Sequence, residues 1–177
     1  MTALPTARRG GEYYRVVAPD WTEPLDTTYS KQYGGRWNPP GEFGALYLNA
    51  NLRVAAANAR AQHAGRAIKL FDLHPSARPE LVTAEVPQRD VVDAVSPDGV
   101  AALGFAESFP FGVSWLPCQA IARAAKADGI SGIATRSNAE ATATRVVGEE
   151  LAVFEGCAVA ERARRPFAAW YPDPIPG

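Results

Sequence analysis

A loop at residues 33–41 holds the densest group of side chains in this sequence that could do chemistry. Its three glycines let the backbone approach a ligand closely, and its two prolines stiffen the turn. Arg36 offers a planar fork of donors that suits a phosphate or pyrophosphate. Trp37 and the later Tyr47 present flat faces for a ring, and Asn38 offers amide hydrogen bonds. The segment therefore predicts a binding loop for a ligand that carries both a phosphate and a ring.

The same loop also has a purely structural interpretation. It is not a Walker loop, since no Gly-Lys-Ser/Thr follows, and it is not a Rossmann fingerprint. A stiff turn with Arg36 as a surface charge and Trp37 in the core has the same sequence pattern. Tyr47 alternates with Leu46 and Leu48, so its side chain could simply point into the core. Both interpretations stay open at the level of sequence.

Length and composition predict one soluble domain over residues 1–177. The chain is 47% hydrophobic and 21% charged, which is ordinary for a globular protein. Its formal net charge of −1 excludes a global basic field, so we expect neither direct nucleic-acid binding nor attraction to an anionic membrane. An anionic ligand must therefore be held by a few placed cations.

The remaining reactive residue types form no recognisable motif. Cys118 and Cys157 lie far apart, and their spacing from His63 and His74 fits no standard zinc pattern, so we expect no metal. No Gly-x-Ser-x-Gly elbow is present for a serine hydrolase. No apolar run approaches membrane-spanning length, and residues 1–11 lack the apolar centre of a signal peptide. We expect a cytoplasmic protein with residues 1–11 flexible.

Mixed strand and helix patterns without strict βαβ alternation place these residues in an α+β domain. Loop chemistry predominates over residues 18–44, and four prolines make the tail at 162–177 an extended strap packed on the domain rather than a regular element. Asn51 can cap a helix that follows it, Gly65 can end that helix, and Gly129 can end a second helix. The pattern predicts strands at 13–17, 45–48, 67–73, 81–86, 132–135 and 150–154, and helices at 52–64 and 117–128.

The motif Gly-Gly-Arg-Trp-Asn-x-x-Gly at residues 34–41, followed by a Leu-Tyr pair and a helix from Leu52, resembles the signature of the RES domain, which is named for an arginine, a glutamate and a serine. Arg36 matches the named arginine and Tyr47 the tyrosine after it. Three further segments match in the expected order: Tyr14-Arg15-Val16, residues 127–137 with the serine at Ser137, and residues 151–154.

The resemblance implies a fold like that of ADP-ribosylating toxins, a single domain with a small, split, mixed β-sheet flanked by helices. Members are typically the toxin of a toxin–antitoxin pair whose antitoxin carries an Xre-type helix-turn-helix. They consume NAD⁺ by hydrolysis or phosphorolysis, and at least one transfers ADP-ribose to a protein. The resemblance thus implies NAD⁺ as substrate, water or phosphate as acceptor, and no cofactor. A catalytically silent NAD⁺-binding member that acts through its partner is the alternative.

The resemblance and the chemistry together assign roles to five residues. Arg36 and Arg15 are candidates to clamp the pyrophosphate, and Tyr47 and Tyr14 to stack on or orient the substrate. Ser137 would hydrogen-bond the substrate or position a neighbouring group. Each has a plainer alternative, because Arg15 could be an exposed strand residue and Ser137 a turn residue.

One expected catalytic residue is altered. The family's glutamate falls in register on Asn58, and the helix at 52–64 contains no acidic residue. Glu42, Glu149 and Glu150 lie elsewhere and do not match the motif. An amide can bind ribose hydroxyls but supplies no charge to an oxocarbenium-like transition state. Three explanations stay open: a weakened or non-enzymatic protein, another carboxylate brought in by the fold, or a substitution made to permit expression.

Overall fold

The computed structural model describes residues 3–140 and 148–171. Three short 3-10 turns accompany the regular elements, at Leu70–Asp72, Pro75–Ala77 and Phe167–Ala169. The strands are β1 (Thr6–Val17), β2 (Ala45–Asn49), β3 (Glu80–Ala94), β4 (Gly132–Arg136), β5 (Glu149–Phe154) and β6 (Ala160–Arg165). The helices are α1 (Thr28–Tyr33), α2 (Leu52–His63), α3 (Pro97–Ala102) and α4 (Trp115–Ala127).

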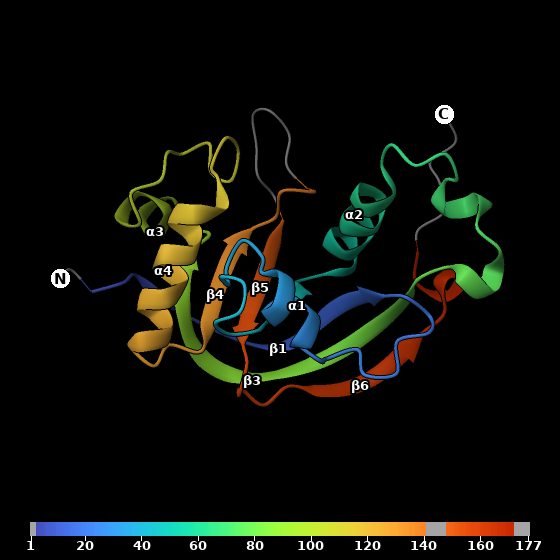
Figure 1. The fold of residues 1–177 in the computed structure, drawn as a ribbon, viewed down its shortest axis with the longest axis horizontal. Helices are drawn as coiled ribbons and strands as arrows, with labels where there is room; N and C mark the ends of the chain where they lie inside the picture. Colours follow the sequence, from blue (N-terminus) through green and yellow to red (C-terminus); the bar gives the residue numbers. More distant parts are fainter. Residues whose placement is uncertain (1–2, 141–147, 172–177) are drawn as a thin grey trace.

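The six strands form one mixed sheet that is split between β1 and β2 (Figure 1). Strand β1 pairs with β3 along most of its length, and β6 lies on the other edge of β3. Strand β5 lies between β2 and β4, and β4 runs parallel to the end of β3. The group β1-β3-β6 meets the group β2-β5-β4 a second time through one residue pair, Tyr14 with Asn49. The expected α+β class with a small, mixed, split sheet is confirmed.

Two helices cover different parts of this sheet. In Figure 1, α4 lies beside β4, and α2 lies above the junction of β1 and β2. The buried face of α2 consists mainly of alanines, which let the helix approach closely; Ala55, Ala56 and Ala59 pack with Leu81 and Phe167. A second group of buried side chains fills the space between the strand groups, with Leu46 and Leu48 of β2, Val86 and Val91 of β3, and Leu151 and Val153 of β5.

Local signals predicted the two longer helices, α2 and α4, and missed the short helices α1 and α3. The helix at 52–64 is α2, and the Asn51 side chain accepts a hydrogen bond from the Val54 amide, as expected of its cap. Gly65 follows it with φ +76°, a left-handed conformation that favours glycine. The helix at 117–128 begins slightly earlier, at Trp115.

Two predictions for the middle of the chain were wrong. Residues 67–73 do not form a strand, because Arg78 donates to the carbonyls of Leu73 and Phe71, at 3.0 and 2.8 Å, that a ladder would use. The loop predicted at 18–44 contains the short helix α1.

The chain ends also differ from expectation. Residues 6–11 were expected to be flexible, yet they belong to β1 and pair with β3 as far as Val92. The tail was expected to form no element, yet its residues up to Arg165 complete β6. Phe167 and Trp170 pack on the domain, while residues 172–177 lie outside the described part of the chain.

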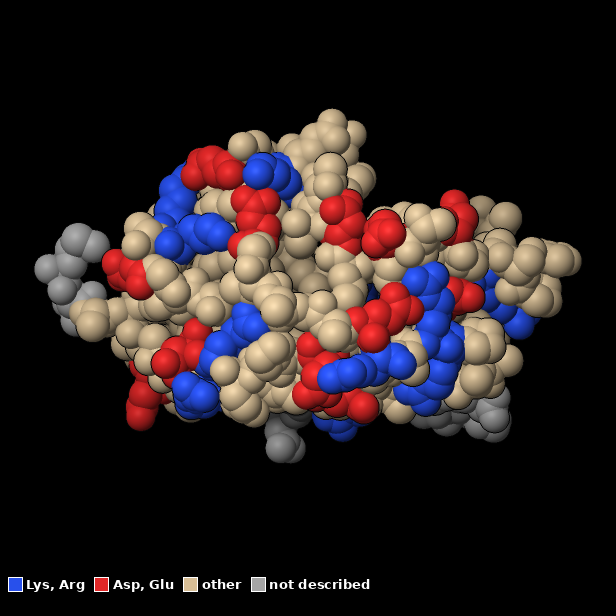
Figure 2. Space-filling view, turned by 90° about the horizontal axis from the view of Figure 1, so that it is seen from below, with Lys and Arg blue, Asp and Glu red and all other residues tan. Residues whose placement is uncertain are grey.

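Basic and acidic side chains are interspersed on the face of the molecule that Figure 2 shows. Oppositely charged residues pair on the surface, such as Arg8 with Asp90 at 3.6 Å and Arg164 with Glu80 at 3.7 Å. This face therefore offers no extended field of one sign to a polyanion. Among the described residues, no helix is both long and apolar enough to cross a membrane.

Candidate functional site

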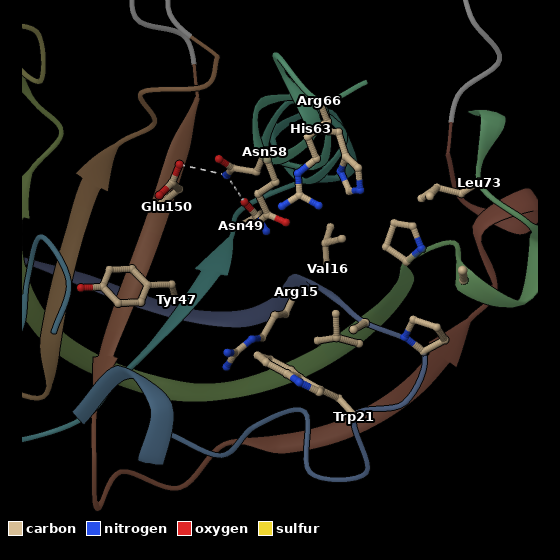
Figure 3. A pocket seen from close by; sticks show the side chains of 16 residues that line it. Arg15, Val16, Trp21, Tyr47, Asn49, Asn58, His63, Arg66, Leu73 and Glu150 are labelled. Carbon is tan, nitrogen blue, oxygen red and sulfur yellow. Dashed lines mark hydrogen bonds between the residues drawn. The ribbon is translucent and has the colours of Figure 1, made fainter. Parts of the chain in front are cut away.

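A pocket of about 520 Å³ opens where the sheet is split, below α2 in the view of Figure 3. Its volume lies in the range of roughly 300–1,000 Å³ that is typical of small-molecule sites. Strands β1, β2 and β5, helix α2 and the segment after β1 all contribute to its walls. The lining side chains that carry polar or charged groups are Arg15, Trp21, Tyr47, Asn49, Asn58, Gln62, His63, Arg66 and Glu150.

One wall of the pocket carries a hydrogen-bonded carboxylate. Glu150 Oε1 accepts from Asn58 Nδ2 at 3.0 Å and from the hydroxyl of fully buried Ser137 at 2.6 Å. Asn58 Nδ2 also donates to Asn49 Oδ1 at 2.6 Å, and Asn49 Nδ2 donates to the Tyr14 carbonyl at 2.9 Å. The network therefore ties α2 to both sides of the split and ends on one acidic group.

The fold thus brings a carboxylate to Asn58, which was one of the three explanations left open by the sequence. Successive side chains of a strand point to opposite faces, so Glu149 and Glu150 diverge. Glu149 pairs with Arg9 at 2.6 Å, whereas Glu150 lines the pocket. Sequence matching missed Glu150 because its place depends on β5 pairing with β2, where it lies opposite Asn49.

Arg15 places a half-buried positive charge in the same pocket. Its guanidinium carbon lies 5.3 Å from the centre of the Trp21 ring, and within the described residues its Nη1 is buried with no hydrogen-bond partner. Burial lowers the pKa of Arg15 to about 10, against the opposing influence of Asp26, so the group stays protonated at neutral pH. A half-buried cation with a buried, unsatisfied donor favours an anionic ligand, because the ligand would compensate both the charge and the donor.

Two further basic residues line the pocket at the end of α2, and both are labelled in Figure 3. Arg66 follows Gly65 directly and is exposed at the rim, and His63 Nδ1 lies 3.0 Å from the Ala59 carbonyl. No sequence pattern singles out Arg66, because its place in the pocket depends on where helix α2 ends. No three His, Cys, Asp or Glu side chains gather to hold a metal ion in residues 3–140 and 148–171.

Tyr47 borders the pocket with its ring while its hydroxyl serves the loop before β2. The hydroxyl donates to Asn38 Oδ1 at 2.8 Å and accepts from the Trp37 amide at 2.9 Å. Burial raises the pKa of Tyr47, so it remains a neutral phenol. Gly35 makes this contact possible, because a Cβ there would meet the Tyr47 hydroxyl and lie 2.9 Å from Asn38 Oδ1.

Trp37 and Asn38 support this loop and do not line the pocket, which differs from the binding roles expected for them. Both are fully buried. The Trp37 ring packs near Phe109, and Asn38 Nδ2 donates to the carbonyls of Ser30 and Phe43 at 2.7 and 3.1 Å. The structural interpretation of the loop therefore holds for these two side chains.

Arg36 and Tyr14 lie close to the pocket without lining it. Arg36 Nη1 makes one long contact, 3.4 Å, to the Val113 carbonyl, and its charge lowers the pKa of Tyr47 against the larger effect of burial. The Tyr14 hydroxyl donates to Glu12. Of the six residues expected to bind ligand, the structure brings Arg15 and Tyr47 into the pocket, together with Asn58, and places Ser137 directly behind Glu150.

Comparison with protein families matches residues 12–172 to the RES domain. The chain is 33% identical over 97 residues to proteins named NAD(+) phosphorylase MbcT from Mycobacterium bovis and Mycobacterium tuberculosis. That match covers 54% of this chain and 51% of each relative, so the chain spans about half the length of the curated relatives it matches. The crystal structure of the M. tuberculosis MbcT–MbcA toxin–antitoxin complex contains a similar fold, with a TM-score of 0.73 and 23% identity over 91% of this chain and 86% of that one.

Proposed function

Because this chain belongs to the RES-domain family, we propose that it is an NAD⁺-cleaving enzyme of the toxin type, which breaks the bond between nicotinamide and ribose. The observation that carries the proposal is the pocket at the split of the sheet, where half-buried Arg15 and the carboxylate of Glu150 line one cavity. NAD⁺ presents a pyrophosphate to the first and a ribose that becomes cationic to the second.

The pocket offers cations for the pyrophosphate and aromatic surfaces for the rings of this substrate. Arg15 is the candidate clamp for the pyrophosphate, with Arg66 at the rim as a second cation. The Tyr47 ring and the Trp21 ring offer surfaces for the flat parts of the dinucleotide. Arg36 lies beside Tyr47 and would contact a ligand that extends past the Tyr47 ring, which agrees with the role that the family resemblance implies for it.

In the reaction, the bond between ribose C1 and the nicotinamide nitrogen breaks, and its electron pair leaves with neutral nicotinamide. No general acid is needed, since nicotinamide is already a good leaving group. With phosphate as acceptor, an oxygen lone pair of HPO₄²⁻ forms the new bond to C1, and a proton is then released to solvent. The printed name of the relatives favours phosphate over water as the acceptor.

A catalytically silent NAD⁺-binding protein is the second candidate, supported by the uncharged Asn58 at the expected glutamate position. The third candidate is an enzyme that transfers ADP-ribose from NAD⁺ to a protein. One assay separates phosphorolysis and hydrolysis from these two alternatives: purified protein is incubated with NAD⁺ in the presence and absence of phosphate, and nicotinamide release is measured. Release that depends on phosphate supports a phosphorylase, release in its absence supports a hydrolase, and no release without a protein acceptor contradicts both.

We also propose an antitoxin partner, of the Xre type that the resemblance implies. The similar solved structure is a toxin–antitoxin complex. In this chain the segment after β1 exposes Trp21, Tyr29 and Tyr33, which is unusual for aromatic side chains on a free surface. Co-expression with the product of the adjacent gene should yield a complex in which nicotinamide release is suppressed. A protein that does not bind that product contradicts the proposal.

A further inference from the structure

We infer that Glu150 on β5 is the catalytic carboxylate of this site, with Asn58 and Ser137 as its positioning residues. The inference rests on the proposed NAD⁺ cleavage and names the group that provides its negative charge. In this chain that charge comes from the central strand of one half of the sheet instead of from helix α2, where Asn58 stands.

The lining of the pocket contains one candidate for the catalytic carboxylate. Among its described lining residues, Glu150 is the single acidic side chain. Its neighbour Glu149 is engaged by Arg9 through two hydrogen bonds, at 2.6 and 3.1 Å, and does not line the pocket. Glu42 is engaged by Arg123 on the surface. Of these three carboxylates, Glu150 is therefore the one that faces the pocket.

The bonds of Asn58 explain why an amide stands at that position. Its Nδ2 donates to two acceptors, Asn49 Oδ1 and Glu150 Oε1. An ionised carboxylate at position 58 could donate to neither, and it would face the charge of Glu150. Asn58 is thus complementary to Glu150: it can hold an acidic side chain that a second acidic side chain would repel.

Ser137, which directly follows β4, donates to the same carboxylate oxygen. Its hydroxyl donates at 2.6 Å, a short distance typical of a charge-assisted hydrogen bond. Its amide donates to the Gly148 carbonyl at 2.8 Å, two residues before Glu150. A Cβ at Gly148 would lie 3.0 Å from Ser137 Cβ and 2.9 Å from Val54 Cγ2, so glycine is what permits this approach.

A carboxylate held in this way acts selectively on the transition state. As the bond to nicotinamide breaks, positive charge develops on ribose C1 and its ring oxygen, and the fixed negative charge stabilises it. Glu150 forms no bond in this step and keeps its electrons, while the acceptor provides the pair for the new bond. Losing one preorganised electrostatic group typically lowers the rate by roughly 10²–10³.

The test compares Glu150→Gln with Glu149→Gln, a matched substitution one residue away on the other face of the strand. Nicotinamide release gives kcat and KM for each, and calorimetry with NAD⁺ and thermal unfolding show that each variant folds and binds. We expect Glu150→Gln to lower kcat by roughly 10²–10³ with a much smaller change in KM, and Glu149→Gln to stay near wild type.

Exchanging the two groups provides the rescue. The double variant Asn58→Glu with Glu150→Gln places a carboxylate on the helix and an amide donor on the strand, so its kcat should rise at least roughly tenfold above that of Glu150→Gln. For the positioning roles, Ser137→Ala should lower kcat more than it raises KM, and Ser137→Thr, which keeps the hydroxyl, should restore most of it.

The outcomes separate this inference from the proposed function. An active wild type whose kcat is unaffected by Glu150→Gln overturns the role of Glu150 and leaves NAD⁺ cleavage intact. Equal losses in Glu150→Gln and Glu149→Gln also overturn it, because they indicate a general effect on β5. A wild type that releases no nicotinamide with either acceptor contradicts the proposed function itself.

Discussion

The side-chain amide of Asn58 on α2 donates to the carboxylate of Glu150 on β5 at 3.0 Å, across the pocket wall between helix and strand. The same nitrogen donates to Asn49 on β2 at 2.6 Å, so three elements meet at one amide group. Because the amide provides hydrogens to both neighbours, its replacement by an acceptor-only group affects the whole wall.

The first prediction concerns Asn58→Glu in the otherwise unchanged protein. Sequence matching alone suggests a gain, since it restores the family's glutamate. With Glu150 present, two carboxylates about 3 Å apart do not both ionise readily, and the bond to Asn49 is lost. We therefore expect kcat for nicotinamide release to fall roughly tenfold or more at neutral pH. A rise in kcat of roughly 10²–10³ would show instead that position 58 carries the charge.

The second prediction concerns Arg15→Met. Loss of the guanidinium removes a charge-assisted contact worth roughly 1.5–3 kcal/mol, so affinity for NAD⁺ in calorimetry should fall roughly 10- to 100-fold. The free energy of unfolding without ligand should stay the same or rise, because a half-buried charge with one buried, unsatisfied donor is removed. Arg8→Met, on the exposed part of the same strand, is the control and should change neither quantity. Unchanged affinity in Arg15→Met would exclude Arg15 from the clamp.

The third prediction concerns Arg36, which lies next to Tyr47 and outside the lining of the pocket. If NAD⁺ extends past the Tyr47 ring, Arg36→Ala should weaken binding by roughly 1.5–3 kcal/mol, and Arg36→Lys should recover only part of it, because one ammonium does not replace the guanidinium fork. Equal affinities of wild type and Arg36→Ala would restrict the ligand to the cavity that Arg15 and Glu150 share.

The fourth prediction concerns Gly35→Ala. The new methyl group would collide with the Tyr47 hydroxyl and with Asn38, and so displace the hydrogen bonds that hold the loop before β2. Overpacking of this kind typically costs about 1–3 kcal/mol, so the midpoint of thermal unfolding should fall by several degrees. An unchanged midpoint would mean that the loop accommodates the methyl group, and that Tyr47 is not fixed by it.

Particular residues show how far the sequence determined the fold and the site. Helix α2 could be predicted because the cap at Asn51, the alanines and Gly65 are all local signals. The early part of β1 and the strand β6 could not be predicted. The segments that contain Gly10 and Arg162 show no alternation of polar and apolar residues, and they form strands only by pairing with β3. Local pattern favours a strand at 67–73, and Arg78 overrides it from outside that segment.

The site follows the same division. Arg15, Tyr47 and Asn58 could be proposed from motif order, and the pocket contains all three. Glu150 could not, because its role depends on which face of β5 turns towards α2 and on the long-range approach of Ser137. Trp37 has the composition of a binding residue, but its burial is decided by α4 and the segment around Phe109.

The crystal structure of the Glu150→Gln variant with NAD⁺ is the most direct test, because we expect the substitution to slow cleavage and to preserve the pocket. The account predicts intact NAD⁺ in the split of the sheet, with its pyrophosphate on Arg15 and the C1 of its nicotinamide ribose close to the side chain of residue 150. NAD⁺ bound elsewhere on the domain, or bound in the pocket with that ribose turned away from residue 150, would contradict it.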